Sequence, residues 1–202
     1  MIVRGLALVL IVAGVILPTA VGLSQPGYSM VSQYLSELGA AGAPNAALVN
    51  YGGFLPTGLA FALLMAVLHP RLPGGAAPRI ALALMALVGV SYVGAVFAPC
   101  EAGCPAQGGP SQTMHNLLGL IGYAGPIAGL VLLAAALRTQ APGLALATLA
   151  TAVLFTGGFL VMTTPEAAGI RGAAQRLADF SLFAWAAALA FRPGARARPA
   201  RA

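Results

Sequence analysis

The stretch HNLLGLIGYAGPIAGLVLLAAAL, residues 115–137, holds no acidic residue, lysine or arginine and is long enough to cross a lipid bilayer as one helix. A helix satisfies its own backbone hydrogen bonds, so a continuous apolar run of this length predicts a transmembrane helix. Strands of a membrane β-barrel would instead alternate apolar and polar residues. Comparable runs predict six spans, at residues 3–23, 47–68, 80–98, 115–137, 143–163 and 174–191.

The composition of the whole chain agrees with this assignment. Hydrophobic residues make up 59% of the 202 residues and charged residues 7%, too few to cover a water-soluble protein of this length. Small residues are frequent within the runs and let helices approach closely in lipid. We therefore expect an all-α integral membrane protein: a compact six-helix transmembrane bundle in one domain, residues 1–191, followed by a disordered, arginine-rich tail, residues 192–202.

The arginines indicate how the bundle is oriented. Most of them lie on one side of the predicted membrane: Arg4, Arg71, Arg79, Arg138, Arg192, Arg196, Arg198 and Arg201. The positive-inside rule makes this side cytoplasmic, so we expect a multi-pass protein of the inner (plasma) membrane with both termini in the cytoplasm. In the alternative, the first run is a cleaved signal peptide, although its apolar core is longer than is usual for one.

Topology also accounts for the net charge of +6, because the arginines are spread over cytoplasmic loop ends. Nucleic acid is therefore not an expected partner. The expected partners are membrane lipids, and the tail RPGARARPARA is either simply disordered or in contact with anionic headgroups.

The first outer loop contains an unusual group of polar residues within YSMVSQYLSELG, residues 28–39. The spacing predicts a short amphipathic helix that follows a turn at Pro26–Gly27 and is capped by Gly39. Its polar face either meets water or lines a cavity at the outer mouth of the bundle. That face consists of Ser29, Ser32, Gln33, Ser36 and Glu37.

Two cysteines, Cys100 and Cys104, lie in the second outer loop. A disulfide between them is the default in an oxidising compartment. Zinc is the competing interpretation, with His115 as a third ligand, but no fourth ligand is apparent and no metal is predicted. No cofactor is predicted either, because the two histidines, His69 and His115, fall at opposite ends of the bundle and cannot supply two haem sites.

Polar side chains of four separate segments lie at one predicted depth, near the outer leaflet. Charges at this depth are costly unless they are paired or face a polar cavity. Since the cytoplasmic half has no comparable group, we expect an outward-facing cavity, with Arg176 and Asp179 as an internal ion pair. The candidate ligand-binding residues are Ser32, Glu37, Asn50, His115, Asn116, Gln175, Arg176 and Asp179.

Four motifs carry a family resemblance: YSMVSQYLSELGA after the first span, NYGGFLPTG opening the second, HNLLGLIGY opening the fourth and GAAQRLADFSLFAW opening the sixth. In these motifs and their order the chain resembles a family of bacterial and archaeal integral membrane proteins known as domain of unknown function 998. Its layout is also similar to that of Frag1/DRAM/Sfk1-type six-span proteins. The family resemblance implies six spans but no activity, and it highlights Ser36, Glu37, His115, Gln175 and Arg176.

Three functions remain open. The leading hypothesis is binding, or transport, of a lipid or small amphiphile, with Arg176 engaging an anionic headgroup. The second is a membrane-embedded lipid hydrolase or transferase in which Glu37 and His115 are the acid/base pair and Ser36 is the nucleophile. No GxSxG or HExxH motif supports this chemistry. The third is an accessory subunit that docks a membrane protein partner.

Overall fold

The computed structural model describes residues 1–192, and every regular element in this range is helical. The long elements form six rods. The first joins α1 (Ile2–Ile11), a π-helical turn (Val12–Ile16) and α2 (Leu17–Ser24); the second joins a π-helical segment (Leu48–Phe54), α3 (Leu55–Leu68) and a 3-10 turn (His69–Arg71). The others are α4 (Ala76–Met85) with α5 (Leu87–Phe97), α6 (Pro110–Leu137), α7 (Pro142–Thr163) and α8 (Arg171–Phe191).

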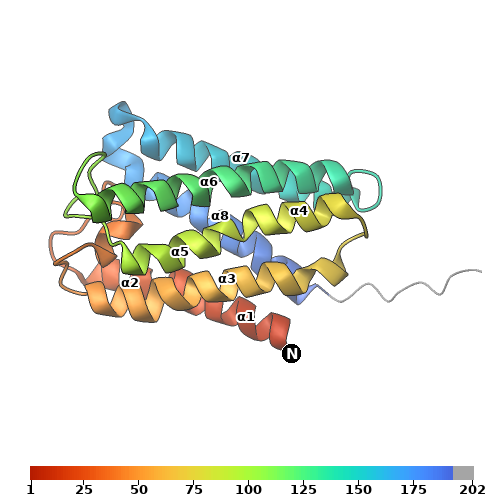
Figure 1. Cartoon of the computed structure of the whole chain (residues 1–202), viewed down its shortest axis with the longest axis horizontal. Coiled ribbons are helices and arrows are strands. Elements are labelled where there is room, and N and C mark those ends of the chain that lie inside the picture. Colours follow the sequence, from red (N-terminus) through yellow and green to blue (C-terminus); the bar gives the residue numbers. More distant parts are fainter. Residues whose placement is uncertain (193–202) are drawn as a thin grey trace, which may run out of the picture.

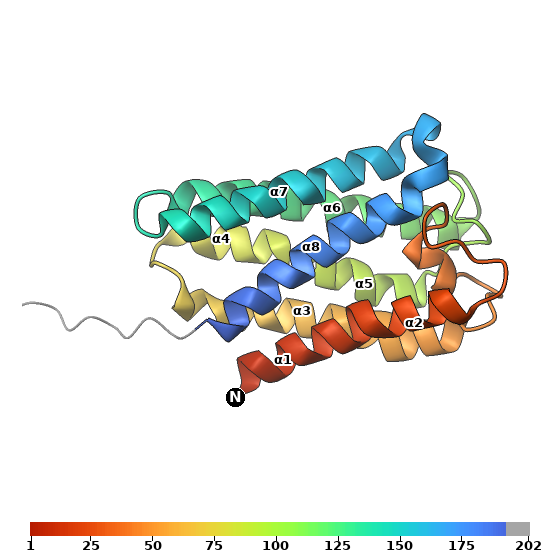
Figure 2. The same ribbon diagram turned by 180° about the vertical axis from the view of Figure 1, so that it is seen from behind.

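The six rods lie side by side in one bundle (Figure 1 and Figure 2). Each rod packs against the next one in the chain, and α8 returns to pack against α1 and α3. Met1 and the last turn of α8 lie at the same end of the bundle, as an even number of antiparallel rods requires. Beyond Arg192, the predicted tail lies outside the described residues.

Five of the rods are long and apolar enough to cross a membrane: Ile2–Ser24, Leu48–Arg71, Ala76–Phe97, Pro110–Leu137 and Pro142–Thr163. The prediction of a multi-pass helical protein is confirmed to this extent. The sixth rod, α8, has the length of a span, but Arg171, Arg176 and Asp179 reduce its apolar character. Its side chains are largely buried against the other rods, with Leu182 and Phe183 fully so.

Prolines account for the irregular turns within the first two rods. Pro56 has no N–H to donate to the carbonyl four residues earlier, as an α-helix requires. The chain widens into a π-helical segment just before it, where Leu55 donates its N–H to the carbonyl oxygen of Asn50. Pro18 follows the π-helical turn of the first rod in the same way. The widened turns keep the rods continuous through the bundle.

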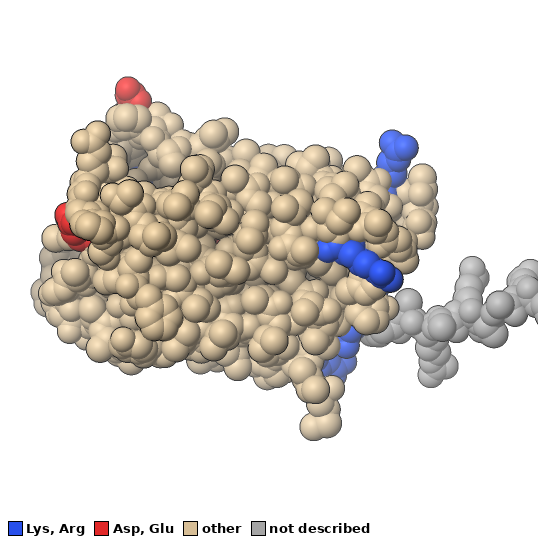
Figure 3. All heavy atoms as spheres, viewed as in Figure 1, with Lys and Arg blue, Asp and Glu red and all other residues tan. Residues whose placement is uncertain are grey.

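On the face of the bundle drawn in Figure 3, the visible charged side chains lie at the two ends rather than along the side. On the face shown, basic groups lie at the end near the N-terminus and acidic groups at the opposite end. The sides expose large apolar residues such as Leu63, Val131 and Leu154. This is the distribution expected of a bundle whose sides face lipid tails.

Glycines bring neighbouring helices into backbone contact. A Cβ at Gly58 of α3 would lie 2.6 Å from the carbonyl oxygen of Gly89 in α5. A Cβ at Gly158 of α7 would lie 2.5 Å from the carbonyl oxygen of Ala174 in α8. Both distances are far below van der Waals contact, so a larger residue would force the helices apart.

Residues 28–39 do not form the predicted amphipathic helix. Residues 30–33 make turns, Tyr34 is extended, and one short 3-10 helix follows at Leu35–Gly39. The turn at Pro26–Gly27 is present, with Gly27 at φ +75°. Gly39 does not cap an α-helix; instead it leaves room for the side chain of Asn50, which a Cβ would strike. The spacing of polar residues does not predict this conformation, because backbone carbonyl groups of the segment accept hydrogen bonds from α8.

Two adjacent glycines of α7 allow a test of the helix packing. Gly158→Ala is expected to lower the free energy of unfolding by about 1–3 kcal/mol, because the new methyl group pushes α8 away. Gly157→Ala is the matched control, since a Cβ at Gly157 meets no atom within 4 Å. Alanine also favours the helix, so the control should lose no stability. Unfolding of both variants in detergent measures the difference; equal losses would contradict the close contact.

Candidate functional site

The segment 28–40, here called the outer loop, is anchored to the start of α8 by Arg176. This arginine is 6% exposed. Its Nη1 donates to the carbonyl oxygens of Met30, at 2.8 Å, and Gln33, at 3.1 Å. Its Nη2 donates to the hydroxyl of Tyr28. A planar guanidinium can hold several acceptors at fixed angles, so one side chain sets the position of the loop backbone.

Tyr28 completes this contact from the loop side. Its hydroxyl donates to the carbonyl oxygen of Tyr34 at 2.7 Å. Burial raises the pKa of Tyr28 above its usual value, although the neighbouring Arg176 guanidinium acts in the opposite direction. The hydroxyl therefore remains protonated and able to donate at neutral pH. Gly172 permits the close approach of α8, because a Cβ there would overlap the backbone of Gln33.

Glu37 is buried within the outer loop, with 8% of its surface exposed. Its Oε1 accepts a hydrogen bond from the backbone N–H of Tyr34 at 2.8 Å, and its Oε2 accepts one from Nε2 of Gln33 at 3.0 Å. Arg171 Nη2 lies 3.7 Å from Oε1 and forms an ion pair with it. The carboxylate thus fixes the local shape of the loop, as a capping group does.

Two adjoining hollows lie at this end of the bundle. The larger, the outer cavity, has a volume of about 510 Å³ and is lined by α6, α7 and the start of α8. The outer loop, the loop before α6 and the 3-10 segment between α7 and α8 (Pro165–Ile170) complete its wall. Helices α6 and α7 diverge towards this end (Figure 1). The smaller, the inner chamber, has a volume of about 60 Å³ and lies between α5, α6 and α8. Five residues line both hollows: Ser36, His115, Gly119, Tyr123 and Gln175.

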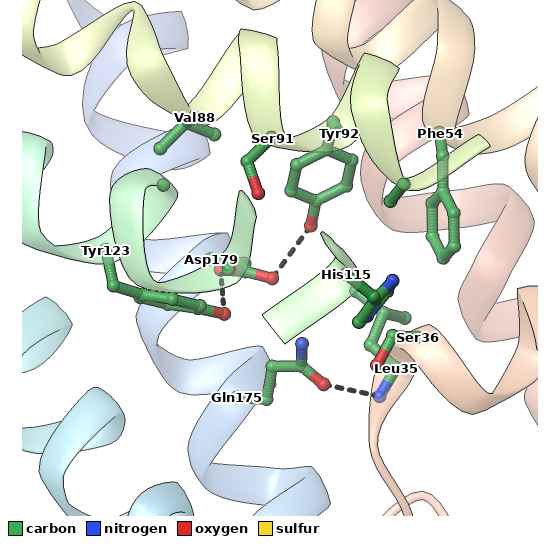
Figure 4. Close-up of a pocket in the computed structure, with 13 residues that line it drawn as sticks. Leu35, Ser36, Phe54, Val88, Ser91, Tyr92, His115, Tyr123, Gln175 and Asp179 are labelled. Atoms are coloured by element: carbon green, nitrogen blue, oxygen red, sulfur yellow. Dashed lines mark hydrogen bonds between the residues drawn. The ribbon is translucent and has the colours of Figure 1, made fainter. Parts of the chain in front are cut away.

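Asp179 lies in the inner chamber and is 3% exposed. The hydroxyl of Tyr92 donates to its Oδ2 at 2.7 Å, and the hydroxyl of Tyr123 donates to its Oδ1 at 2.8 Å (Figure 4). The prediction that Asp179 forms an ion pair with Arg176 is wrong. Within residues 1–192, Asp179 forms no ion pair. The i, i+3 spacing places the two residues near each other on α8. The guanidinium of Arg176 instead donates to carbonyl oxygens of the outer loop.

Gln175 and His115 stand where the two hollows meet. Oε1 of Gln175 accepts the backbone N–H of Leu35 at 2.6 Å, and its amide nitrogen points towards the inner chamber (Figure 4). Nδ1 of His115 lies 3.0 Å from the carbonyl oxygen of Ala98. If Nδ1–H donates to that oxygen, Nε2 of the imidazole is left as an acceptor.

The predicted disulfide joins Cys100 and Cys104. It contacts Ser36 of the outer loop, whose hydroxyl lies 3.3 Å from Sγ of Cys104. The two sulfurs and a ring nitrogen of His115 lie within 4.8 Å of one another, the grouping that the zinc alternative requires. Sulfurs bonded to each other are not thiolates, however, and thiolates are the form that binds metal. The disulfide instead positions Ser36.

The structure brings part of the predicted site together at the hollows: Ser36, His115, Asn116, Gln175 and Asp179. The other predicted residues support the outer loop. The carbonyl oxygen of Ser32 accepts Nε of Arg171, and Nδ2 of Asn50 donates to the carbonyl oxygen of Gly39 at 2.9 Å. Glu37 and Arg176 line neither hollow. The acid/base pairing of Glu37 with His115 therefore gains no support from the geometry.

Three hydroxyl-bearing residues that line the inner chamber fall outside the predicted set: Ser91, Tyr92 and Tyr123. The two tyrosines stand within apolar runs, where an aromatic ring is readily assigned to packing alone. A signal was nevertheless present, because a hydroxyl within a membrane span requires a hydrogen-bond partner. Asp179 at similar depth is such a partner, but the sequence does not show which spans are neighbours.

The arrangement suits recognition better than covalent chemistry. The inner chamber combines a carboxylate, an amide and hydroxyls with aromatic walls. The Ser36 hydroxyl contacts a disulfide sulfur, and no hydrogen bond links it to His115 among the described residues. A nucleophile activated by a neighbouring base requires such a link.

The rods and the polar hollow at one end define a multi-pass helical membrane protein. Residues 4–192 match the family described as Protein of unknown function (DUF998), and the chain belongs to this family. The resemblance drawn from the four motifs is thereby confirmed. No curated protein and no solved structure matches the chain.

The anchoring role of Arg176 can be tested by a conservative substitution. Arg176→Lys is expected to lower the free energy of unfolding by about 1–3 kcal/mol, because one ammonium cannot serve Met30, Gln33 and Tyr28 together. Amide exchange of residues 28–40 should accelerate. Arg79→Lys is the control, because Arg79 is exposed at the other end of the bundle, where it donates to His69 and does not touch the outer loop. If the loop exchanges equally in both variants, Arg176 is not the anchor.

Proposed function

We propose that this protein binds a lipid or small amphiphile in the outer cavity and inner chamber. The observation that carries the proposal is a buried carboxylate, Asp179, in a small chamber that adjoins a larger, mostly apolar cavity at one end of the bundle. The outer cavity offers apolar surface, and the inner chamber offers hydrogen-bonding groups around Asp179. An amphiphile matches both parts at once.

The dimensions of the outer cavity support this assignment. Its volume of about 510 Å³ falls within the range of about 300–1,000 Å³ typical of small-molecule sites. Leu120, Phe159 and Met162 supply apolar wall for a hydrocarbon chain. The adjoining chamber, with Asp179 and Gln175, supplies the few polar groups that orient a ligand in such sites.

The geometry argues against the anionic headgroup that we expected from the sequence. Arg176 does not line either hollow, because its donors engage the outer loop. Arg171 lines the outer cavity, but it is paired with Glu37 and packs over the ring of Tyr34 at 4.5 Å. The inner chamber therefore contains a carboxylate, that of Asp179. Among the described residues, every arginine that lines a hollow is already paired.

We further propose that all six rods cross the membrane, with the arginine-rich end in the cytoplasm. The positive-inside rule supports this orientation. The hollows lie at the other end and would then open towards the outer leaflet or the external solution. The disulfide between Cys100 and Cys104 would lie in the oxidising compartment, where such bonds persist.

Blocking the outer cavity tests the binding proposal. A Cβ at Gly119 meets no atom within 4 Å, so Gly119→Trp should fill the cavity without breaking the helix contacts. The probes are dodecylamine, dodecanol and dodecanoate, each carrying a photoreactive diazirine in its chain. At least one should label lining residues of the wild-type protein in lipid nanodiscs, and Gly119→Trp should reduce that labelling at least about tenfold, as loss of a buried ligand contact does.

Gly157→Trp is the matched control, because it places the same side chain where a Cβ also meets open space but away from the hollows. Its labelling should equal that of the wild type. Failure of all three probes to label the lining residues of the wild-type protein would overturn the proposed function.

Site-directed labelling tests the proposed orientation. Thr139 lies between α6 and α7, and Glu166 lies between α7 and α8, so these two exposed residues stand at opposite ends of α7. Glu166→Cys should react with a membrane-impermeant maleimide in intact cells, whereas Thr139→Cys should react after permeabilisation alone, since lipid excludes the reagent from the interior. The reverse pattern would place the hollows on the cytoplasmic side.

A further inference from the structure

We propose that the inner chamber binds the protonated amine of an amphiphile, with Asp179 as its counter-ion. This inference rests on the proposed function and names the class of ligand. The chamber holds a buried carboxylate that two tyrosines orient and that forms no ion pair with a cation of residues 1–192. A cationic headgroup would supply the charge that this site lacks.

The first argument is the environment of Asp179. It lies eight residues into α8, or about 12 Å along the helix axis from Arg171. A carboxylate at such depth is costly unless a cation or a polar cavity accompanies it. The cation one turn away, Arg176, donates to Met30, Gln33 and Gly172 instead. The two tyrosine hydroxyls occupy one position on each carboxylate oxygen, and each oxygen can accept a further hydrogen bond.

The second argument is the aromatic wall of the chamber. Phe54, Tyr92 and Tyr123 line it together with Asp179 (Figure 4). Phe54 and Tyr92 pack edge to face, with ring centroids 5.5 Å apart. Aromatic groups around a cation are the usual means of recognising ammonium ligands, because the ring faces carry negative potential. A carboxylate and aromatic rings together favour an amine over a carboxylate or phosphate.

The third argument is size. By a comparable measure a single water needs about 10–15 Å³, so the chamber of about 60 Å³ has room for a headgroup of a few heavy atoms. The hydrocarbon chain must then lie in the outer cavity, which shares Gly119 and Tyr123 with the chamber. The size of the chamber therefore favours an amphiphile with a small amine headgroup over a lipid with a bulky zwitterionic one.

The three diazirine probes with a twelve-carbon chain test this inference. They are compared at pH 7 in nanodiscs of zwitterionic lipid, with empty nanodiscs correcting for partition. The amine should label the lining residues of the wild-type protein at a concentration at least about tenfold lower than the alcohol, with the carboxylate weakest. Because this comparison uses unaltered protein, it does not depend on the folding of any variant.

Asp179→Asn then identifies the counter-ion. It should bring the amine to the level of the alcohol while leaving labelling by the alcohol in place. Glu166→Gln, which removes an exposed acid from the same end of the bundle, should keep the preference for the amine. Equal labelling by amine and alcohol in the wild type, or a preference that survives Asp179→Asn, would overturn the inference and leave amphiphile binding standing. Labelling by none of the probes would overturn the proposed function itself.

Discussion

The end of this bundle that carries the two hollows depends on the buried guanidinium of Arg176. It binds the backbone of the outer loop through the carbonyl groups of Met30 and Gln33, while Gly172 allows the chain to approach closely. A loop of irregular backbone carries carbonyl groups that an apolar environment would leave unsatisfied. One charged side chain with several donors meets this requirement, and so fixes the loop over the ends of the helices.

The same contact shapes the electrostatics of the hollows. Since Arg176 is engaged by the loop, Asp179 is left with two tyrosine hydroxyls as partners. The inner chamber thus contains an acid rather than an ion pair. Arg171, which borders the outer cavity, is likewise balanced by Glu37. The net result is a chamber of negative character joined to a cavity with substantial apolar wall.

Several features could be predicted from the sequence because they depend on composition or on short spacing. Five membrane-length apolar helices, the close helix packing at glycines and the disulfide of Cys100 with Cys104 belong to this class. Of the site, Asp179, Gln175 and His115 could be found, since polar groups are scarce in these spans. The predictions of an amphipathic helix and of an Arg176–Asp179 pair are wrong, because the outer loop bonds to α8 and takes up the donors of Arg176.

The sequence by itself determined the class of the protein, since a chain with so few charges can bury its apolar runs only in lipid or in one another. It also determined the depth at which polar residues stand along each rod. The tertiary structure alone decided which of those residues meet: Tyr92 and Tyr123 reach Asp179 from two other rods, and Arg176 turns to the outer loop. The reason is physical, because each donor and acceptor bonds to the partner that the packed helices bring within reach, wherever that partner stands in the chain.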